Sequence, residues 1–207
     1  MTSQALPEYQ HNVVAHAGAH PVEEGMSRGM AGMVLFISSE IMLFGGLFAG
    51  FFFVYNQATV WPPEGVHHLD AVIGGILTVV LVISGLVAHM GVVGAKSGNR
   101  SQFIAGMALA CILGTIFIAG QATEWLTLMD EGLTAKTGAY GATFYVLTGF
   151  HGAHVIAGLA MLLVVLVRGF WRDFTPSRHL FVDAATLYWH FVDIVWVFLY
   201  ALLYVLV

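Results

Sequence analysis

The apolar stretch TLYWHFVDIVWVF, residues 186–198, decides the fold of this chain. It lies within a longer apolar run, residues 180–206, which is long enough to cross the roughly 30 Å hydrocarbon core of a bilayer as one helix. His190 and Asp193 are three positions apart, so they share one face of that helix. Polar groups at such a depth are costly and usually face protein, so the pair predicts a functional or assembly-critical position.

Four similar apolar runs precede this one, and together they predict an all-α membrane protein, a bundle of five transmembrane helices. The predicted spans cover about residues 30–54, 71–95, 103–128, 140–167 and 180–206. All five prolines lie outside them, which leaves each helix unbroken. The composition, 58% apolar and 9% charged, is typical of membrane proteins. We expect a polar N-terminal tail over residues 1–29 and a single transmembrane domain over residues 30–207.

The basic residues predict the direction of the chain across the membrane. Those on the side of the N-terminus are Arg28, Lys96, Arg100, Arg168, Arg172 and Arg178. Only Lys136 lies on the opposite side. By the positive-inside rule, the N-terminus is expected in the cytoplasm and the C-terminus on the outer side.

Several other classes of protein are not expected. The net charge of −5 and the lack of a basic patch give no support for nucleic-acid binding. The single Cys111 excludes a disulfide framework and a cysteine metal cluster. The tail does not resemble a secretory signal, and its histidines, His11, His16 and His20, fit no common metal motif.

Five polar groups fall near the centre of the predicted spans, at depths that follow from a rise of about 1.5 Å per residue. They are Glu40, His151, His154, His190 and Asp193. Because they occupy one layer, hydrogen bonds among them are feasible. Glu40 could be a proton-exchanging acid, but spacing alone favours a neutral carboxyl that makes one structural hydrogen bond.

Three further residues lie toward the ends of the spans. Glu124 follows Gln121 by three positions, which predicts a hydrogen-bonded pair near the interface. His89 and Arg168 lie toward the cytoplasmic ends of their helices. Each could contact a lipid headgroup or extend toward the interface.

The histidines could in principle bind a metal or a haem, and the glycines could form a contact between helices. His151 and His154 have a spacing that can chelate a metal, and His89, His151 or His190 could ligate a haem from facing helices. Each histidine has a plausible carboxylate or backbone partner nearby, and no Glu-x-x-His pair of the di-iron type occurs, so no cofactor or metal is expected in this chain. Gly46 and Gly50 form a G-x-x-x-G pair, for which packing within the bundle is favoured over a homodimer face.

A family resemblance rests on five motifs that follow one another along the chain. They are Ser39-Glu40, Trp61-Pro62-Pro63, Gln121-Ala122-Thr123-Glu124-Trp125, Tyr140-Gly141 with GFHGAHV at residues 149–155, and YWHFVDIVW at residues 188–196. From about residue 33 to its end, the chain resembles the subunit III family of haem–copper oxidases in its short, five-span bacterial form. The two additional N-terminal spans of the mitochondrial type are absent from this sequence.

The resemblance implies a non-catalytic core subunit of a proton-pumping aa3-type cytochrome c oxidase in a bacterial plasma membrane. Such a subunit packs on the catalytic subunit I, in a complex with subunit II and further respiratory subunits, and haem and copper belong to those partners. It holds phospholipid, supports proton uptake and limits inactivation during turnover. Glu40 matches the family's carbodiimide-reactive glutamate, and Arg168 matches an arginine that binds a lipid headgroup. Asp173 stands where relatives often have a histidine near that headgroup.

The resemblance also bears on the electron donor. Glu40 and Trp61-Pro62-Pro63 are more similar to the cytochrome c oxidases than to the quinol oxidases, so cytochrome c is expected as a donor that binds another subunit. A quinol oxidase subunit is the alternative. Two hypotheses assign the chain to a different class of protein. One is a haem-bearing membrane anchor, and the other is a small proton channel that uses Glu40, His151, His190 and Asp193.

Overall fold

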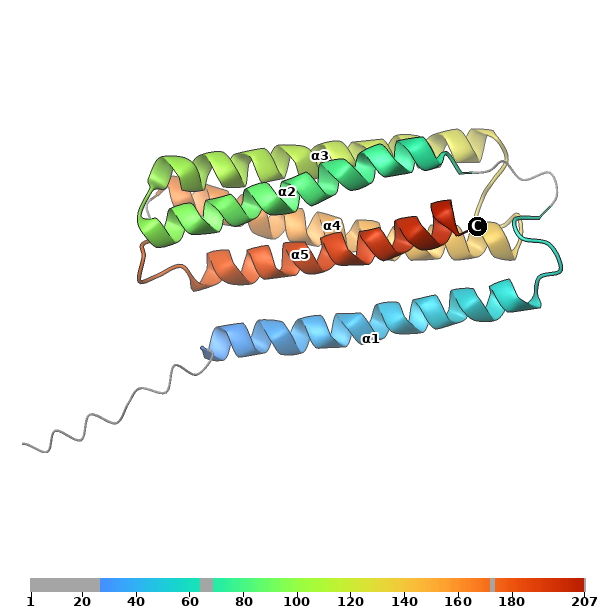
Figure 1. Cartoon of the computed structure of the whole chain (residues 1–207), viewed down its shortest axis with the longest axis horizontal. Helices are drawn as coiled ribbons and strands as arrows, with labels where there is room; N and C mark the ends of the chain where they lie inside the picture. Colours follow the sequence, from blue (N-terminus) through green and yellow to red (C-terminus); the bar gives the residue numbers. More distant parts are fainter. Residues whose placement is uncertain (1–26, 64–68, 172–173, 207) are drawn as a thin grey trace, which may run out of the picture.

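The computed structural model describes residues 27–63, 69–171 and 174–206, and it confirms the predicted all-α membrane fold. Within these residues, five helices are long and apolar enough to cross a membrane (Figure 1). They are α1 (Arg28–Gln57), α2 (Ala71–Ser97), α3 (Arg100–Asp130), α4 (Ala139–Phe170) and α5 (Leu180–Tyr200), and α5 continues into a π-helix, η1 (Ala201–Val205). The tail histidines, Arg172 and Asp173 lie outside the described residues.

Capping side chains mark where several of the helices begin. The hydroxyl of Ser27 accepts from the backbone N–H of Met30 at the start of α1. Asp70 caps α2 in the same way, and Asn99 caps α3. These caps satisfy backbone donors that a helix leaves free at its first turn, and they place the starts of α1 and α3 slightly before the predicted apolar runs.

The α2–α3 pair is a tight antiparallel hairpin. Gly98, with φ of 74°, ends α2, and Asn99 directly begins α3, so the two helices must run side by side. Glycines permit the close approach, because a Cβ added to Gly106 of α3 would lie 2.6 Å from the backbone nitrogen of Gly91 in α2. The small residues of α2 therefore pack within the bundle.

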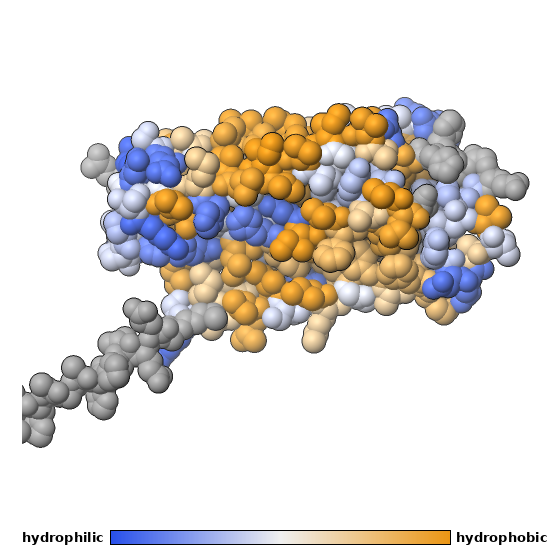
Figure 2. Space-filling view, in the orientation of Figure 1, coloured by the Kyte–Doolittle hydropathy of each residue, from blue (hydrophilic) through white to orange (hydrophobic). Residues whose placement is uncertain are grey.

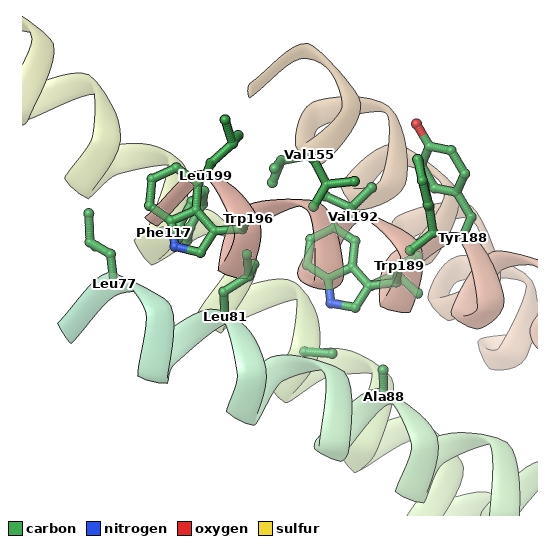
Figure 3. Packing of buried hydrophobic residues seen from close by; sticks show 14 of the residues in the cluster. Leu77, Leu81, Ala88, Phe117, Val155, Tyr188, Trp189, Val192, Trp196 and Leu199 are labelled. Atoms are coloured by element: carbon green, nitrogen blue, oxygen red, sulfur yellow. The ribbon is translucent and has the colours of Figure 1, made fainter. Parts of the chain in front are cut away.

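α5 contacts α1, α2 and α4 and lies at the centre of the bundle, and Figure 3 shows several of its side chains among the buried residues of the core. It packs against α2 and α4, and Trp189 and Trp196 are fully buried at its core. The indole nitrogen of Trp189 donates to Oγ of Ser84 at 3.0 Å, and that of Trp196 donates to Oγ1 of Thr78 at 2.9 Å. Both acceptors belong to α2, so α5 satisfies its buried indole N–H groups without water.

α1 is the peripheral helix, and it runs along the edge of the bundle against α4 and α5 (Figure 1). Only 11% of its apolar window is buried, compared with 61% for the α5 window. The prediction for Gly46 and Gly50 was wrong, because a Cβ added to either glycine would meet nothing within 4 Å. Their face of α1 points away from the other helices, since α1 uses a different face for its contacts.

On the face shown in Figure 2, the lateral surface is largely hydrophobic, and hydrophilic residues gather toward the two ends and in a strip that extends inward from one of them. This distribution is the one expected for a chain whose sides meet lipid hydrocarbon. The direction of insertion, inferred from the basic residues, stays a prediction.

Candidate functional site

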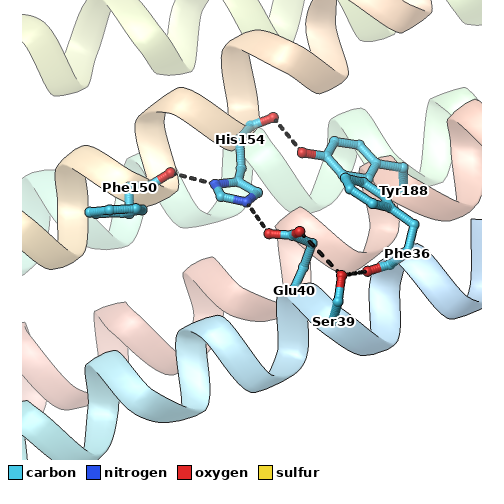
Figure 4. A network of polar contacts seen from close by, with 6 residues as sticks. All are labelled: Phe36, Ser39, Glu40, Phe150, His154 and Tyr188. Atoms are coloured by element: carbon cyan, nitrogen blue, oxygen red, sulfur yellow. Dashed lines mark hydrogen bonds and ion pairs between the residues drawn. The ribbon is translucent and has the colours of Figure 1, made fainter.

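A short polar contact joins the side chain of Glu40 in α1 to that of His154 in α4 (Figure 4). Oε2 of Glu40 lies 2.8 Å from Nε2 of His154, and the two side chains are only 16% and 14% exposed. Nδ1 of His154 lies 2.6 Å from the carbonyl oxygen of Phe150, one turn earlier in α4. The histidine is therefore held at both ring nitrogens.

This geometry constrains the protons in the two hydrogen bonds of the imidazole. A carbonyl oxygen can only accept, so Nδ1 of His154 must carry a proton and donate it to Phe150. Nε2 and Oε2 then share a single proton. Either a protonated Glu40 donates to a neutral imidazole, or an imidazolium donates to a carboxylate. The arrangement can serve as a structural hydrogen bond and can also exchange a proton between two groups.

Aromatic residues of α1 surround the pair and share its face of the helix. Phe36, Glu40 and Phe44 follow one another at intervals of four, which places them on one side of α1. The ring of Phe36 stacks on Tyr188 with centroids 6.0 Å apart, and Phe44 meets the ring of His154 at 4.9 Å. The two phenylalanines were not singled out from the sequence, although their spacing around Glu40 could have identified this contact face.

His190 and Asp193 form a second, separate pair in α5. Nδ1 of His190 lies 3.6 Å from Oδ2 of Asp193, slightly beyond a direct hydrogen bond. The Asp193 side chain is 10% exposed and faces the backbone of Gly85 in α2, whereas the His190 side chain is 36% exposed. The predicted proximity of the two residues is present, and α2 is the helix that their face meets.

His151 does not have the carboxylate or backbone partner that the sequence suggested. It is 1% exposed, and neither ring nitrogen makes a hydrogen bond within the described residues. Its ring stacks on Trp196 with centroids 5.0 Å apart and meets Phe117 edge-on at 5.9 Å. It points into the aromatic core because three residues advance a helix by about 300°, which directs His151 and His154 to different neighbours.

The five central groups are therefore not joined in one network. Glu40 bonds to His154 beside α1, His190 lies near Asp193 beside α2, and His151 is enclosed among aromatic rings. A common depth in the membrane allowed mutual contact, but the directions in which the helices point these side chains separate them.

Glu124 is part of a three-residue cluster near the other end of the bundle. Nε2 of Gln121 donates to Oε2 of Glu124 at 3.1 Å, so the two residues interact as their spacing predicted. The hydroxyl of Tyr204, in η1, lies 2.8 Å from both carboxylate oxygens and donates to them. Tyr204 could not be assigned to Glu124 from the sequence, because 80 residues separate them.

Tyr204→Phe is expected to lower the stability of the chain by about 1 kcal/mol, since the partly buried carboxyl of Glu124 loses a hydrogen-bond donor that Gln121 cannot replace. Thermal unfolding of the purified protein in detergent measures the change. Tyr200→Phe is the matched control, because the Tyr200 hydroxyl donates only to the exposed carbonyl of Ala71. Equal melting temperatures for the two variants would contradict the assignment.

Arg168 and His89, predicted near lipid headgroups, occupy different surroundings. The guanidinium of Arg168 lies over the rings of Phe174 and Phe181, 5.4 Å and 5.8 Å from their centroids, at the end of α4. His89 is exposed on α2, and its ring lies 6.1 Å from that of His190. The structure thus places His89 beside the α5 pair.

An apolar groove of about 520 Å³ separates α1 from α5. Its walls are almost entirely hydrocarbon, and they include Ile37, Ile41, Phe48, Ile194 and Phe198. A groove of this character can take an acyl chain or an apolar side chain. As for metals, no group of three or more histidine, cysteine, aspartate or glutamate residues in the described parts of the chain is arranged to hold an ion.

Comparison with known proteins identifies the family of this chain. The family model described as cytochrome c oxidase subunit III matches residues 9–207. Cytochrome c oxidase subunit 3 of Corynebacterium diphtheriae is 38% identical over 84% of this chain and 85% of its own length. The Synechocystis protein of the same name is 38% identical over 100% of this chain and 88% of its own.

A third relative shows a similar level of identity. Cytochrome c oxidase subunit 3 of Scyliorhinus canicula is 41% identical over 89% of this chain and 70% of its own length. The five-helix membrane fold, the order of the motifs and these matches agree, and the chain belongs to the cytochrome c oxidase subunit III family.

Proposed function

We propose that this chain is the non-catalytic core subunit III of a proton-pumping, aa3-type cytochrome c oxidase in a bacterial plasma membrane. Family membership makes it part of an oxidase complex with other subunits. In our proposal, it packs on subunit I, while haem and copper are held by its partners and cytochrome c delivers electrons to another subunit. Its own contribution is to support proton uptake and to keep the complex stable during turnover.

The observation that carries this proposal is the Glu40–His154 pair. It joins the peripheral α1 to α4 near the middle of both helices, where polar side chains are rare unless they have a role. Glu40 matches the family's carbodiimide-reactive glutamate, and that chemistry requires a protonated carboxyl. The carboxyl meets this requirement in the form of the pair in which Glu40 holds the shared proton.

Two features support phospholipid binding. The groove between α1 and α5 has a volume of about 520 Å³ and almost entirely hydrocarbon walls, which suit an acyl chain. Arg168 lies at the end of α4, the side predicted to be cytoplasmic, where its guanidinium, which lies over the rings of Phe174 and Phe181, can meet a lipid phosphate. We propose that one bound lipid uses Arg168 and another places an acyl chain in the groove.

The packing of the helices argues against a haem held by His89 and His190. α2 and α5 approach so closely that a Cβ on Gly85 would collide with the Asp193 carboxylate. No porphyrin fits between helices in such contact. His151, enclosed between Trp196 and Phe117, likewise has no open face for a macrocycle.

A tagged purification in mild detergent, with an absorption spectrum and a subunit gel, tests the proposal. We expect haem bands to arrive with larger partner chains and to be lost when this chain is stripped away. Haem that stays with this chain alone would overturn the proposal. A colourless, solitary chain that conducts protons in liposomes would also overturn the proposal and would support the alternative hypothesis of a small proton channel.

A further inference from the structure

A polar seam runs between α2 and α5, and its register is regular. At the end of the helices, Nζ of Lys96 lies 3.1 Å from Oδ1 of Asp183. His89 lies seven residues before Lys96 in α2, and His190 lies seven residues after Asp183 in α5. The two imidazoles face each other, with ring centroids 6.1 Å apart. We call the residues Lys96, Asp183, His89, His190 and Asp193 the α2–α5 seam.

The seam carries hydrophilic surface from one end of the molecule toward its middle. Figure 2 shows a hydrophilic strip that extends inward from one end between α2 and α5, with hydrophobic surface on both sides. His190 lies ten residues into α5, about 15 Å from the helix start at the usual rise per residue. The inner part of the seam therefore lies within the depth that lipid hydrocarbon would cover.

The two imidazoles of the seam have unused hydrogen-bonding capacity. His89 is exposed and makes no hydrogen bond to any described residue. The His190 side chain is 36% exposed, and its nearest polar neighbour is the Asp193 carboxylate 3.6 Å from Nδ1. This leaves Nε2 of His190 and both ring nitrogens of His89 without a partner among the described parts of the chain.

Lipid tails cannot satisfy these groups. Polar side chains within a membrane almost always face protein or a water-filled cavity, because hydrocarbon offers no hydrogen bonds. The exposed residues around the seam on α2, such as Leu86 and Val93, are aliphatic and are suited to contact with another helix. Polar groups set in an apolar surface are typical of contacts between transmembrane helices.

We propose that the α2–α5 seam is the docking surface for a transmembrane helix of a partner subunit, which brings hydroxyl or amide side chains to the level of His89 and His190. Such side chains both donate and accept hydrogen bonds, so they can pair with an imidazole in either tautomer. This inference rests on the proposed function, because it requires an oxidase complex. It goes further by naming the face that is used and the chemistry that the partner supplies.

Photo-crosslinking in the intact complex tests the proposal. Benzoylphenylalanine is placed at Leu86, three residues from His89 and 62% exposed, and separately at Ile112 on α3, which is 55% exposed at a similar depth. We expect the Leu86 position to crosslink to a partner subunit at least tenfold more than the Ile112 position does. Mass spectrometry of the product identifies the partner peptide, which should be transmembrane.

Three outcomes would overturn the proposal. Adducts with lipid alone at Leu86 would show that lipid covers the seam, and a product of two copies of this chain would show a homodimer. Equal yields at Leu86 and Ile112 would remove the distinction between the two faces. None of these outcomes would be confused with failure of the proposed function, which would appear earlier, as a wild-type chain that purifies without haem-containing partners.

A pair of substitutions provides an independent readout. His89→Leu removes the imidazole from an exposed position, and Met90→Leu, at the neighbouring exposed residue, is the matched control. If a polar partner helix docks here, His89→Leu should lower retention of the subunit after detergent washing several-fold, while Met90→Leu leaves it unchanged. Retention of His89→Leu at or above the wild-type amount would overturn the proposal, since leucine suits a lipid-covered surface better than histidine.

Discussion

Replacing Glu40 by alanine is expected to release α1 from the bundle. The substitution removes the polar contact between Glu40 and His154 and leaves Nε2 of His154 without a partner. Hydrogen bonds between membrane helices contribute about 1–2 kcal/mol, and an orphaned polar group adds a penalty of similar size. A loss of about 2 kcal/mol shifts the ratio of attached to released α1 by roughly 30-fold.

Few other interactions would compensate for this loss. Only 11% of the apolar window of α1 is buried, and its remaining contacts are apolar, among them those of Phe36 with Tyr188 and of Phe44 with His154. The other helices bury far more surface, so α1 should move while the rest of the bundle stays folded.

Spin labels can follow the movement. One label at Met42 on α1 and one at Ile156 on α4, both at exposed positions, are measured by double electron–electron resonance in nanodiscs after replacement of Cys111. The distance distribution should broaden and shift by several ångströms in Glu40→Ala. In Glu40→Gln, which keeps the length and a hydrogen-bonding end, it should remain narrow. An unchanged distribution in Glu40→Ala would show that the pair does not hold α1.

The second large effect concerns the contact between α2 and α3. Gly106→Ala is expected to destabilise the protein by about 1–3 kcal/mol, because overpacking at a tight contact forces the helices apart. The new Cβ would lie 2.6 Å from the nitrogen and 2.8 Å from the Cα of Gly91, and 2.9 Å from the carbonyl oxygen of Val87. All three are backbone atoms, so no side chain can rotate away to relieve the clash.

Gly46→Ala is the matched control, since it makes the same change in α1, where a Cβ meets nothing within 4 Å. Here alanine should stabilise the helix slightly, by about 0.5–1 kcal/mol, through its higher helix propensity. Melting of fluorescent fusions followed by size-exclusion chromatography would rank the two variants. If Gly106→Ala melts at or above the temperature of Gly46→Ala, the close contact between α2 and α3 is not as the structure shows it.

The sequence alone predicted the number of membrane helices and several local contacts. Hydropathy over long runs is sufficient to identify spans, because a bilayer requires about 20 consecutive apolar residues. Spacing within one helix was likewise sufficient for Gln121 with Glu124 and for His190 with Asp193, since residues three apart are always neighbours on a helix surface.

Contacts between helices were beyond the reach of such reasoning. Glu40 and His154 are 114 residues apart, and their common depth allowed equally well a contact of Glu40 with His151, His190 or Asp193. The same holds for Tyr204 with Glu124 and for the two tryptophans that donate to Ser84 and Thr78. Hydropathy sets the depth of a residue, whereas its partner depends on which helices are neighbours and how each is rotated.

Two errors have this same origin. His151 and His154 were treated alike, yet one enters the aromatic core and the other meets α1, because rotation about the helix axis separates them. Gly46 and Gly50 were assigned to packing within the bundle, but α1 turns the face of Phe36, Glu40 and Phe44 inward. The sequence by itself predicted five helices long and apolar enough to cross the membrane, and it gave the position of each polar group along its helix. Only the tertiary structure decided which faces meet, because lipid and a neighbouring helix are equally apolar and hydropathy cannot distinguish them.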